Sequence, residues 1–223
     1  MHRNRKPLLG SVLALLALAA PAAQAWPEVP MPEDAQYTPV SAHMEHNGLP
    51  MRAGRYTTVL SPDQLVGFYH RQWGQGRADV TVLEDRRIIG HHQGKHFITV
   101  EVRAEGRGSL AQIGITELLG RTPAQPPGHG FPQPAGTRVI TDTRFLDDPG
   151  RTVSLEVRLP VAQAWEWYRA RLQQQGWQHD ARAGCAVMAR QCSASFQRGR
   201  EAMTLTFDHQ PGHTAVVANQ LRR

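Results

Sequence analysis

Three histidines lie close together in the segment Ile89–His96, which reads Ile-Gly-His-His-Gln-Gly-Lys-His. If Gln93 and Gly94 form a hairpin turn, His91 faces His96 on the neighbouring strand. Two imidazoles held opposite each other could share a transition metal ion. The spacing places no carboxylate as a third ligand, so we favour a solvated hairpin tip, with no cofactor. A metal site at His91 and His96 is the alternative.

The segment His43-Met44-Glu45-His46 is similar to a zinc-protease signature in composition only. That signature needs two histidines one turn apart on a helix, whereas these residues precede Asn47-Gly48, a pair typical of a hairpin turn. The sequence contains no nucleophile elbow, no phosphate-binding glycine loop and no dinucleotide fingerprint. We therefore assign no catalytic residue and expect a protein that is not an enzyme.

The only two cysteines are Cys185 and Cys192. Their separation fits neither a Cys-x-x-Cys redox motif nor a zinc site, and an even number of cysteines in an exported chain favours pairing. We predict a structural disulfide between them, because they could face each other across a hairpin.

Two aromatic pairs, Phe68-Tyr69 and Trp167-Tyr168, occur in segments with helical spacing. At 100° per residue, Phe68 and Trp167 lie well away from the centres of the apolar stripes of their helices. Each could cover a sheet edge or a neighbouring strand. The alternative is that Phe68 and Trp167 are binding residues, in contact with the other half of the chain or with a partner.

The N-terminus has the three parts of a secretory signal. Basic residues precede an apolar run over residues 7–20, which is too short to span a membrane, and Ala23-Gln24-Ala25 provides a cleavage site after Ala25. Trp26, not cysteine, would begin the mature chain. We expect residues 1–25 to be a signal peptide and the mature protein to lie in the periplasm without a membrane anchor; secretion is the alternative.

The charge of the mature chain excludes one class of partner. The full chain carries 25 basic and 19 acidic residues, and cleavage after Ala25 leaves 22 basic residues and a net charge of +3. No block of basic residues is present, so we expect no nucleic acid partner.

The mature sequence follows the same plan twice. Each copy opens with Pro-x-Pro, at Pro30 and at Pro132, and each has Gly-Arg, at Gly54 and at Gly150. The aromatic pairs are 99 positions apart, and the late strand cores that begin at Thr99 and Thr204 are 105 apart. These matches predict a duplication with about six extra residues after the second helix.

Each copy is expected to be a hairpin, a helix and three or four antiparallel strands. Alternation over Thr152–Leu159 predicts a half-buried strand. Ser61-Pro62-Asp63-Gln64 is a helix start, and Gly176 a helix end, with Trp177 folded back on the helix. The fold class is thus α+β: two related domains, each an antiparallel sheet with one packed helix. The first domain covers residues 26–119, a linker rich in proline and glycine covers 120–136, and the second domain covers 137–223.

The run Tyr168-x-x-x-Leu172-x-x-x-Gly176-Trp177 resembles a module of uncharacterised exported proteins of Gram-negative bacteria. The layout also resembles the helix-on-sheet modules carried in tandem by lipoproteins of the outer-membrane barrel-assembly machinery. The first copy departs from the motif, because Trp73 replaces the leucine and no Gly-Trp follows. The resemblance implies a non-catalytic protein of the cell envelope.

These observations lead to one functional hypothesis and its alternatives. The chain is expected to be an exported binding or accessory protein that contacts an envelope protein or a surface component. The competing class is a metal-dependent hydrolase that uses His91 and His96. A secreted effector is the third possibility.

Overall fold

The computed structural model describes residues 25–180, 184–185 and 189–222. Of the expected signal peptide, only Ala25 falls among these residues, so the signal itself lies outside the described chain. Part of the segment after the second helix, where about six extra residues were expected, also lies outside the described chain.

The described chain contains two runs of elements in the same order, strand–strand–helix followed by four strands. The first run is β1 (Gln36–His46), β2 (Leu49–Thr58), α1 (Pro62–Trp73), β3 (Asp79–Leu83), β4 (Arg86–Gln93), β5 (His96–Glu105) and β6 (Gly108–Glu117). The second is β7 (Arg138–Phe145), β8 (Gly150–Val157), α2 (Val161–Gln174), β9 (Gln178–His179), β10 (Gln191–Arg198), β11 (Glu201–Gln210) and β12 (His213–Arg222). The α+β composition and the predicted order of elements are confirmed.

The strands of the described chain form one antiparallel sheet rather than the two separate sheets that were expected. Its order is β3-β4-β5-β6-β2-β1-β7-β8-β12-β11-β10-β9, with β1 and β7 in contact at the centre. The prediction was wrong on this point because each predicted sheet ends in an edge strand, and the two edges pair with each other.

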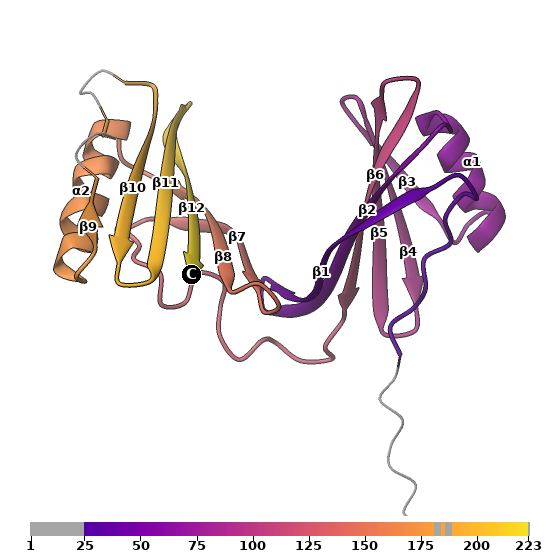
Figure 1. Ribbon diagram of the computed structural model, residues 1–223, viewed down its shortest axis with the longest axis horizontal. Helices are drawn as coiled ribbons and strands as arrows, with labels where there is room; N and C mark the ends of the chain where they lie inside the picture. The colour runs from indigo at the N-terminus through magenta and orange to yellow at the C-terminus, as the bar shows by residue number, and fades with distance from the viewer. Residues whose placement is uncertain (1–24, 181–183, 186–188, 223) are drawn as a thin grey trace, which may run out of the picture.

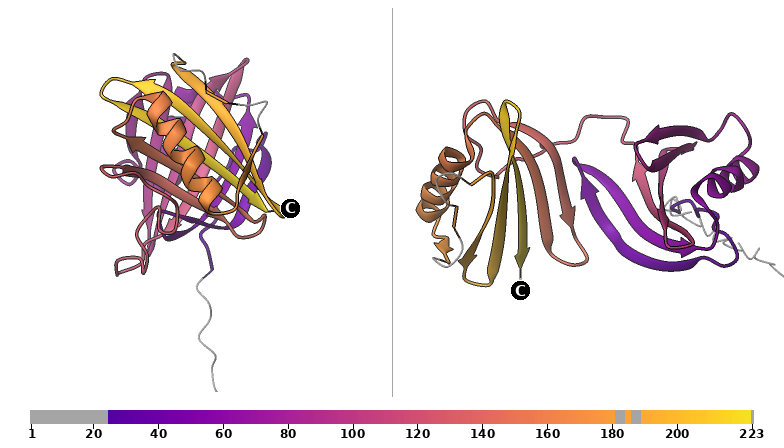
Figure 2. Two further views of the ribbon diagram at one scale, coloured as in Figure 1. Left: turned by 90° about the vertical axis from the view of Figure 1, so that its left-hand side faces the viewer. Right: turned by 90° about the horizontal axis from the view of Figure 1, so that it is seen from above.

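The two helices lie on the outer sides of a bent molecule. Figure 1 shows α1 and α2 at opposite ends of the long axis, each against its own part of the sheet, and Figure 2 shows α2 crossing the outer face of its strands. The faces of the sheet that carry no helix therefore turn toward each other, and the strands that join the two parts are β1 and β7.

Each half buries its own apolar cluster between helix and sheet. In the first half Tyr56, Leu65 and Tyr69 pack with Ile98 and Val100. In the second half the largest fully buried side chains are those of Tyr168, Phe196, Phe207, Leu155, Leu172 and Leu205. Burial of one such side chain contributes roughly 1.5–3 kcal/mol to folding, so each helix is held mainly by this packing.

The helix boundaries follow the expected capping chemistry. The Ser61 hydroxyl accepts a hydrogen bond from the Gln64 amide, and the Gln64 side chain accepts one from the Ser61 amide. This capping box satisfies backbone donors at the start of α1. After α2, Gly176 adopts φ +84° and the Trp177 amide donates to the Leu172 carbonyl, which returns Trp177 to the core.

One predicted match between the two copies is wrong. Gly54 lies in the middle of β2, opposite Ile113, and the Tyr37 side chain occupies the space that a Cβ atom at this position would need. Gly150 instead begins β8, opposite Leu221. The two glycines serve different needs, since one makes room for an aromatic ring and the other follows a turn.

Candidate functional site

The pairing of β1 with β7 at the centre of the sheet is short, and side-chain hydrogen bonds add to the contact beyond it. Met44, Glu45 and His46 of β1 pair with Phe145, Arg144 and Thr143 of β7. Beyond the pair, the Asp147 carboxylate accepts hydrogen bonds from the Ser41 hydroxyl and the Ala42 amide, both at 2.8 Å. These bonds hold the pKa of Asp147 at about 2, with the bond from Ser41 the largest cause.

The turn between β1 and β2 binds the second half of the molecule. Asn47 and Gly48 adopt φ +51° and +78°, as the predicted hairpin turn requires. The Asn47 amide donates to the Asp142 carbonyl at 2.8 Å, and the Asn47 side-chain oxygen accepts from the Asp142 amide at 2.9 Å. A Cβ atom at Gly48 would lie 2.7 Å from the Pro123 side chain, so only glycine permits this approach.

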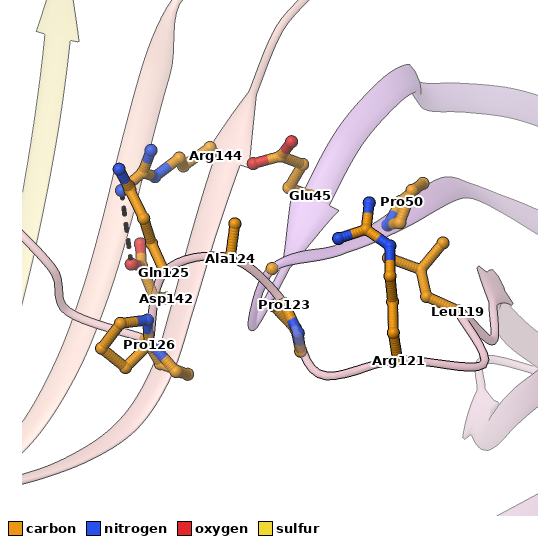
Figure 3. Close-up of a pocket in the computed structure, with 12 residues that line it drawn as sticks. Glu45, Pro50, Leu119, Arg121, Pro123, Ala124, Gln125, Pro126, Asp142 and Arg144 are labelled. Atoms are coloured by element: carbon orange, nitrogen blue, oxygen red, sulfur yellow. Dashed lines mark ion pairs between the residues drawn. The ribbon is translucent and has the colours of Figure 1, made fainter.

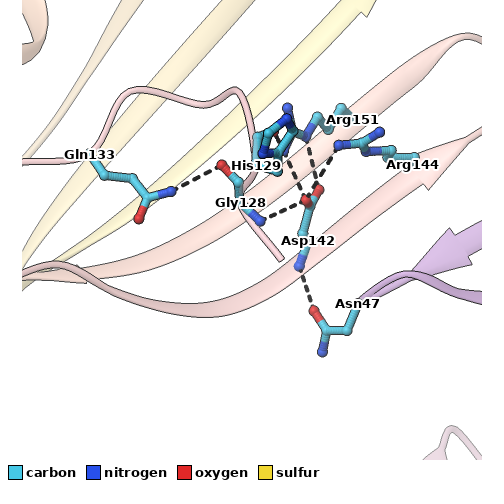
Figure 4. Close-up of polar contacts among 7 residues, drawn as sticks. All are labelled: Asn47, Gly128, His129, Gln133, Asp142, Arg144 and Arg151. Atoms are coloured by element: carbon cyan, nitrogen blue, oxygen red, sulfur yellow. Dashed lines mark hydrogen bonds and ion pairs between the residues drawn. The ribbon is translucent and has the colours of Figure 1, made fainter. Parts of the chain in front are cut away.

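Asp142 is the centre of the polar network at this junction (Figure 4). Its carboxylate accepts two hydrogen bonds from the Arg151 guanidinium, at 2.9 and 2.8 Å, and one from the Gly128 amide at 2.8 Å. Burial alone would raise the pKa of Asp142, but the bonds from Arg151 and Gly128 and the nearby charge of Arg144 outweigh it, and the pKa is lowered. The carboxylate is therefore ionised and paired, which fixes the linker against β7.

A cavity of about 440 Å³ lies between the linker and the β1–β7 pair. Figure 3 shows Glu45 and Arg121 on one side of it and Arg144 and Asp142 on the other. The remaining lining comes from Gly48, Pro50 and Leu119 and from the linker residues Pro123, Ala124, Gln125, Pro126 and Pro127. We call this cavity the junction pocket.

The charges of the junction pocket are only partly paired within the described chain. Asp142 is matched by Arg151, and Arg144 approaches it at 3.9 Å as a second cation. No ion pair within the described residues involves Glu45 or Arg121. Among the described residues, Arg121 and Glu45 are thus without an ion pair and Arg144 is held only by its 3.9 Å pair with Asp142, so these three groups can meet a ligand.

The three histidines of the β4–β5 hairpin are not arranged as expected. Gly94 and Lys95 form the loop, with Gly94 at φ +59°, so His91 lies opposite Ile98, and His96 lies opposite Gln93. The predicted pairing of His91 with His96 is therefore wrong. The expected register has its turn at Gln93-Gly94, and the observed register has its turn at Gly94-Lys95. The apolar pattern could not distinguish them, because both keep the same side chains on the core face. The observed register places Gly94 first in the turn, where a positive φ is required that glycine accepts most readily.

Both of these histidines are buried in aromatic contacts rather than solvated. His91 stacks on Trp73 with ring centroids 4.5 Å apart and bonds through Nδ1 to the Arg77 carbonyl oxygen. His96 lies 5.0 Å from the Trp26 ring, and burial lowers the pKa of His96. Among the described residues, no three His, Cys, Asp or Glu side chains are close enough to hold a metal ion.

The aromatic residues Phe68 and Trp167 occupy equivalent positions but do not meet. Each packs at the margin of its own core and makes an edge-to-face contact with the tyrosine that follows it, at an interplanar angle of 83° in both cases. The helices lie at opposite ends of the molecule (Figure 1), so the proposed contact between halves through these residues is wrong. Trp167 also lines a shallow cavity with Phe131 and Pro132.

The predicted disulfide is confirmed. Cys185 and Cys192 are bonded, with their Cα atoms 5.3 Å apart, and the bond links the segment before β10 to that strand. The residues of the junction pocket, by contrast, were not anticipated. The Asn47-Gly48 pair was the one available signal, and it indicates only a turn, since nothing in it specifies Asp142 as its partner.

A second cavity of about 400 Å³ lies in the first half beside the N-terminal segment. Trp26, Tyr37 and Arg52 line it, and the Arg52 guanidinium lies 4.8 Å over the Trp26 ring. Trp26, the expected first residue of the mature chain, is thus part of the folded structure.

Among the described residues, no helix has the length and apolar character needed to cross a membrane. Comparisons of the chain with protein-family models, with curated proteins and with solved structures gave no match.

Proposed function

We propose that this chain is an exported, non-catalytic binding protein of the cell envelope, built from two related halves, and that the junction pocket holds its ligand. The observation that carries the proposal is the set of charged groups, Glu45, Arg121 and Arg144, that faces the junction pocket without full pairing inside the chain.

Repeated details support the relation between the halves. The strands β4, β5 and β6 begin at residues 86, 96 and 108, and β10, β11 and β12 begin at 191, 201 and 213, each 105 positions later. The Ser109 hydroxyl donates to the Leu60 carbonyl before α1, and the Thr214 hydroxyl, 105 positions later, donates to the Leu159 carbonyl before α2. A hydrogen bond matched in this way, from a buried hydroxyl residue in each half, is unexpected for unrelated halves.

The chemistry of the junction pocket favours binding over catalysis. Asp142 is ionised and held by Arg151, so it is a poor proton donor or acceptor near neutral pH. The two guanidinium groups fit a carboxylate or another planar anion, and Glu45 fits a cationic group on the same ligand. The ligand is therefore an anionic or zwitterionic component of the envelope, and the fixed junction presents its binding groups without rearrangement.

The compartment is supported by the disulfide and by the ordered packing of Trp26. A disulfide persists in an oxidising environment. Trp26 contacts Arg52 and His96, so cleavage after Ala25 would leave these contacts in place.

Photo-crosslinking in intact envelopes tests the proposal. A photoreactive amino acid at Ala124, which is exposed and lines the junction pocket, is expected to capture a specific adduct. The same group at the exposed residue Ala104 of β5 is the positional control. Combined Arg121→Ala and Arg144→Ala substitutions should reduce the adduct at least tenfold, whereas Arg107→Ala, which also removes an exposed guanidinium, should not.

Two results would contradict the proposal. One is an adduct at Ala124 whose yield is unchanged in the double variant while circular dichroism shows a native fold. The other is stoichiometric zinc in protein purified without an affinity tag, since that would favour the metal-dependent alternative.

A further inference from the structure

The two ends of the twelve-stranded sheet differ in how they are protected. At one end β9 has two residues, packs beneath α2 and leads into the disulfide-linked segment. At the other end β3 has five residues, all exposed, while α1 packs mainly on β4 and β5. The outer side of β3 is therefore open.

β3 has few of the features that usually keep an edge strand from pairing. It is short and begins with the charged residue Asp79, but it contains no proline, lysine or bulge, and its register with β4 is regular from Asp79 to Leu83. Val80, Val82 and Leu83 are 36%, 61% and 46% exposed. An exposed apolar edge of this kind is suited to the addition of another strand.

The hairpin geometry identifies the backbone groups that face outward. Leu83 and Arg86 flank a two-residue loop, Glu84-Asp85, with Glu84 at φ +55°. In such a hairpin the residue pair that flanks the loop exchanges two backbone hydrogen bonds. Along the two strands, hydrogen-bonded pairs then alternate with pairs whose amide and carbonyl groups point away from each other. The amide and carbonyl groups of Val80 and Val82 thus point away from β4.

We infer that a second copy of this chain covers β3 by antiparallel pairing of the two β3 strands about a two-fold axis through Thr81. In this register Val80 lies opposite Val82 of the second copy, and their outward amide and carbonyl groups form four hydrogen bonds. Both valines lie on the face of buried Ile89, so the pairing extends the apolar layer beneath α1.

Charge complementarity favours a second copy over an unrelated peptide. The same two-fold axis brings the exposed Arg77 of each chain toward the exposed turn residues Glu84 and Asp85 of the other, so one cation meets an acidic turn at each end, while Asp79 lies opposite Leu83. The pairing is also of the kind already present between β1 and β7, where two edge strands of like units join antiparallel. The contact is limited to one short strand per chain, so the dimer is expected to dissociate on dilution.

Sedimentation velocity over a range of concentrations tests the inference on the mature chain with its disulfide intact. The native protein is expected to shift from monomer to dimer as its concentration rises. Val82→Lys should remain monomeric, because it places two lysines in the apolar pairing. Val59→Lys, at a valine that is 74% exposed just beyond the end of β2, should dimerise like the native chain.

A cysteine at position 81 tests the register. Thr81 lies opposite Thr81 of the second copy, so the Thr81→Cys variant should form a covalent dimer on mild oxidation, whereas Val59→Cys should not. The inference is overturned if the native chain is monomeric throughout, if Val82→Lys dimerises as the native chain does, or if Thr81→Cys gives no covalent dimer. Circular dichroism of each variant separates loss of pairing from loss of fold.

Discussion

The tyrosines that follow the two aromatic pairs occupy equivalent helix positions but differ in hydrogen bonding. The Tyr69 hydroxyl lies 2.9 Å from that of Tyr56, and both side chains are buried. The Tyr168 hydroxyl is buried without a hydrogen-bond partner among the described residues. Burial raises the pKa of Tyr56 to about 12 and raises that of Tyr168, so both hydroxyls stay protonated at neutral pH.

This difference predicts that replacing each tyrosine by phenylalanine changes the free energy of unfolding differently at the two positions. Tyr69→Phe leaves the Tyr56 hydroxyl buried and unpaired and should lower the free energy of unfolding by about 1–2 kcal/mol. Tyr168→Phe removes an unpaired polar group and should leave stability unchanged or raise it. Urea denaturation of both variants measures the difference, and equal losses in the two would show that the hydroxyl of Tyr168 is satisfied.

Asp142 gives a second prediction at the scale of single residues. Asp142→Asn leaves the Arg151 guanidinium, which is 17% exposed, without its counter-charge. The free energy of unfolding should fall by about 2 kcal/mol, less than for a fully buried pair because Arg151 keeps some contact with water. Asp148→Asn, at an exposed aspartate of the β7–β8 turn, should change stability little. Similar losses in both variants would contradict the role given to Asp142.

At the scale of elements, the helices differ in their first turn. Ser61 caps α1 with its side chain, whereas Pro160 precedes α2 and provides no side-chain cap. Ser61→Ala should lower stability by about 1 kcal/mol. Pro160→Ser should raise it by up to about 1 kcal/mol, because Pro160 has the extended backbone (φ −57°, ψ 152°) that a capping residue uses. Thermal unfolding compares the two, and a loss of stability in Pro160→Ser would contradict the interpretation.

Elements with local signals could be predicted from the sequence. The capping box, the Asn47-Gly48 turn and the alternation around Leu155 each depend on neighbouring residues, and each is present in the structure. The pairing of His91 could not be predicted in the same way. Two registers satisfy the same apolar pattern, and only the backbone at Gly94 separates them.

At the scale of the whole molecule, the sequence indicates the two halves but not how they join. A strand at the free edge of a sheet and a strand that pairs with the edge of a sheet far away in sequence can have the same pattern of apolar and polar residues. The join depends on contacts such as those of Asn47 with Asp142 and of Ser41 with Asp147, which are about a hundred residues apart in sequence. Residues 120–136 were expected to be only a linker rich in proline and glycine, and in the structure this segment also binds β7 through Gly128.

Because Asp142 and Asp147 both lie at this join, acid should weaken the join before the two cores. Each carboxyl has a pKa below its usual value, so it stabilises the folded state above the unfolded pKa, and this contribution is lost as the pH falls through the folded pKa. For Asp147 the loss runs from about pH 4 down to about pH 2. Protection of the Asn47 and Leu146 amides, which bond across the join, should therefore decrease over this range more than that of Leu205 in the second core. Hydrogen exchange detected by mass spectrometry measures all three segments.

Asp147→Asn should lower protection at the join even at neutral pH and reduce its pH dependence, whereas Asp148→Asn should retain the native profile. Uniform loss of protection across join and cores would mean that the twelve-stranded sheet opens as one unit.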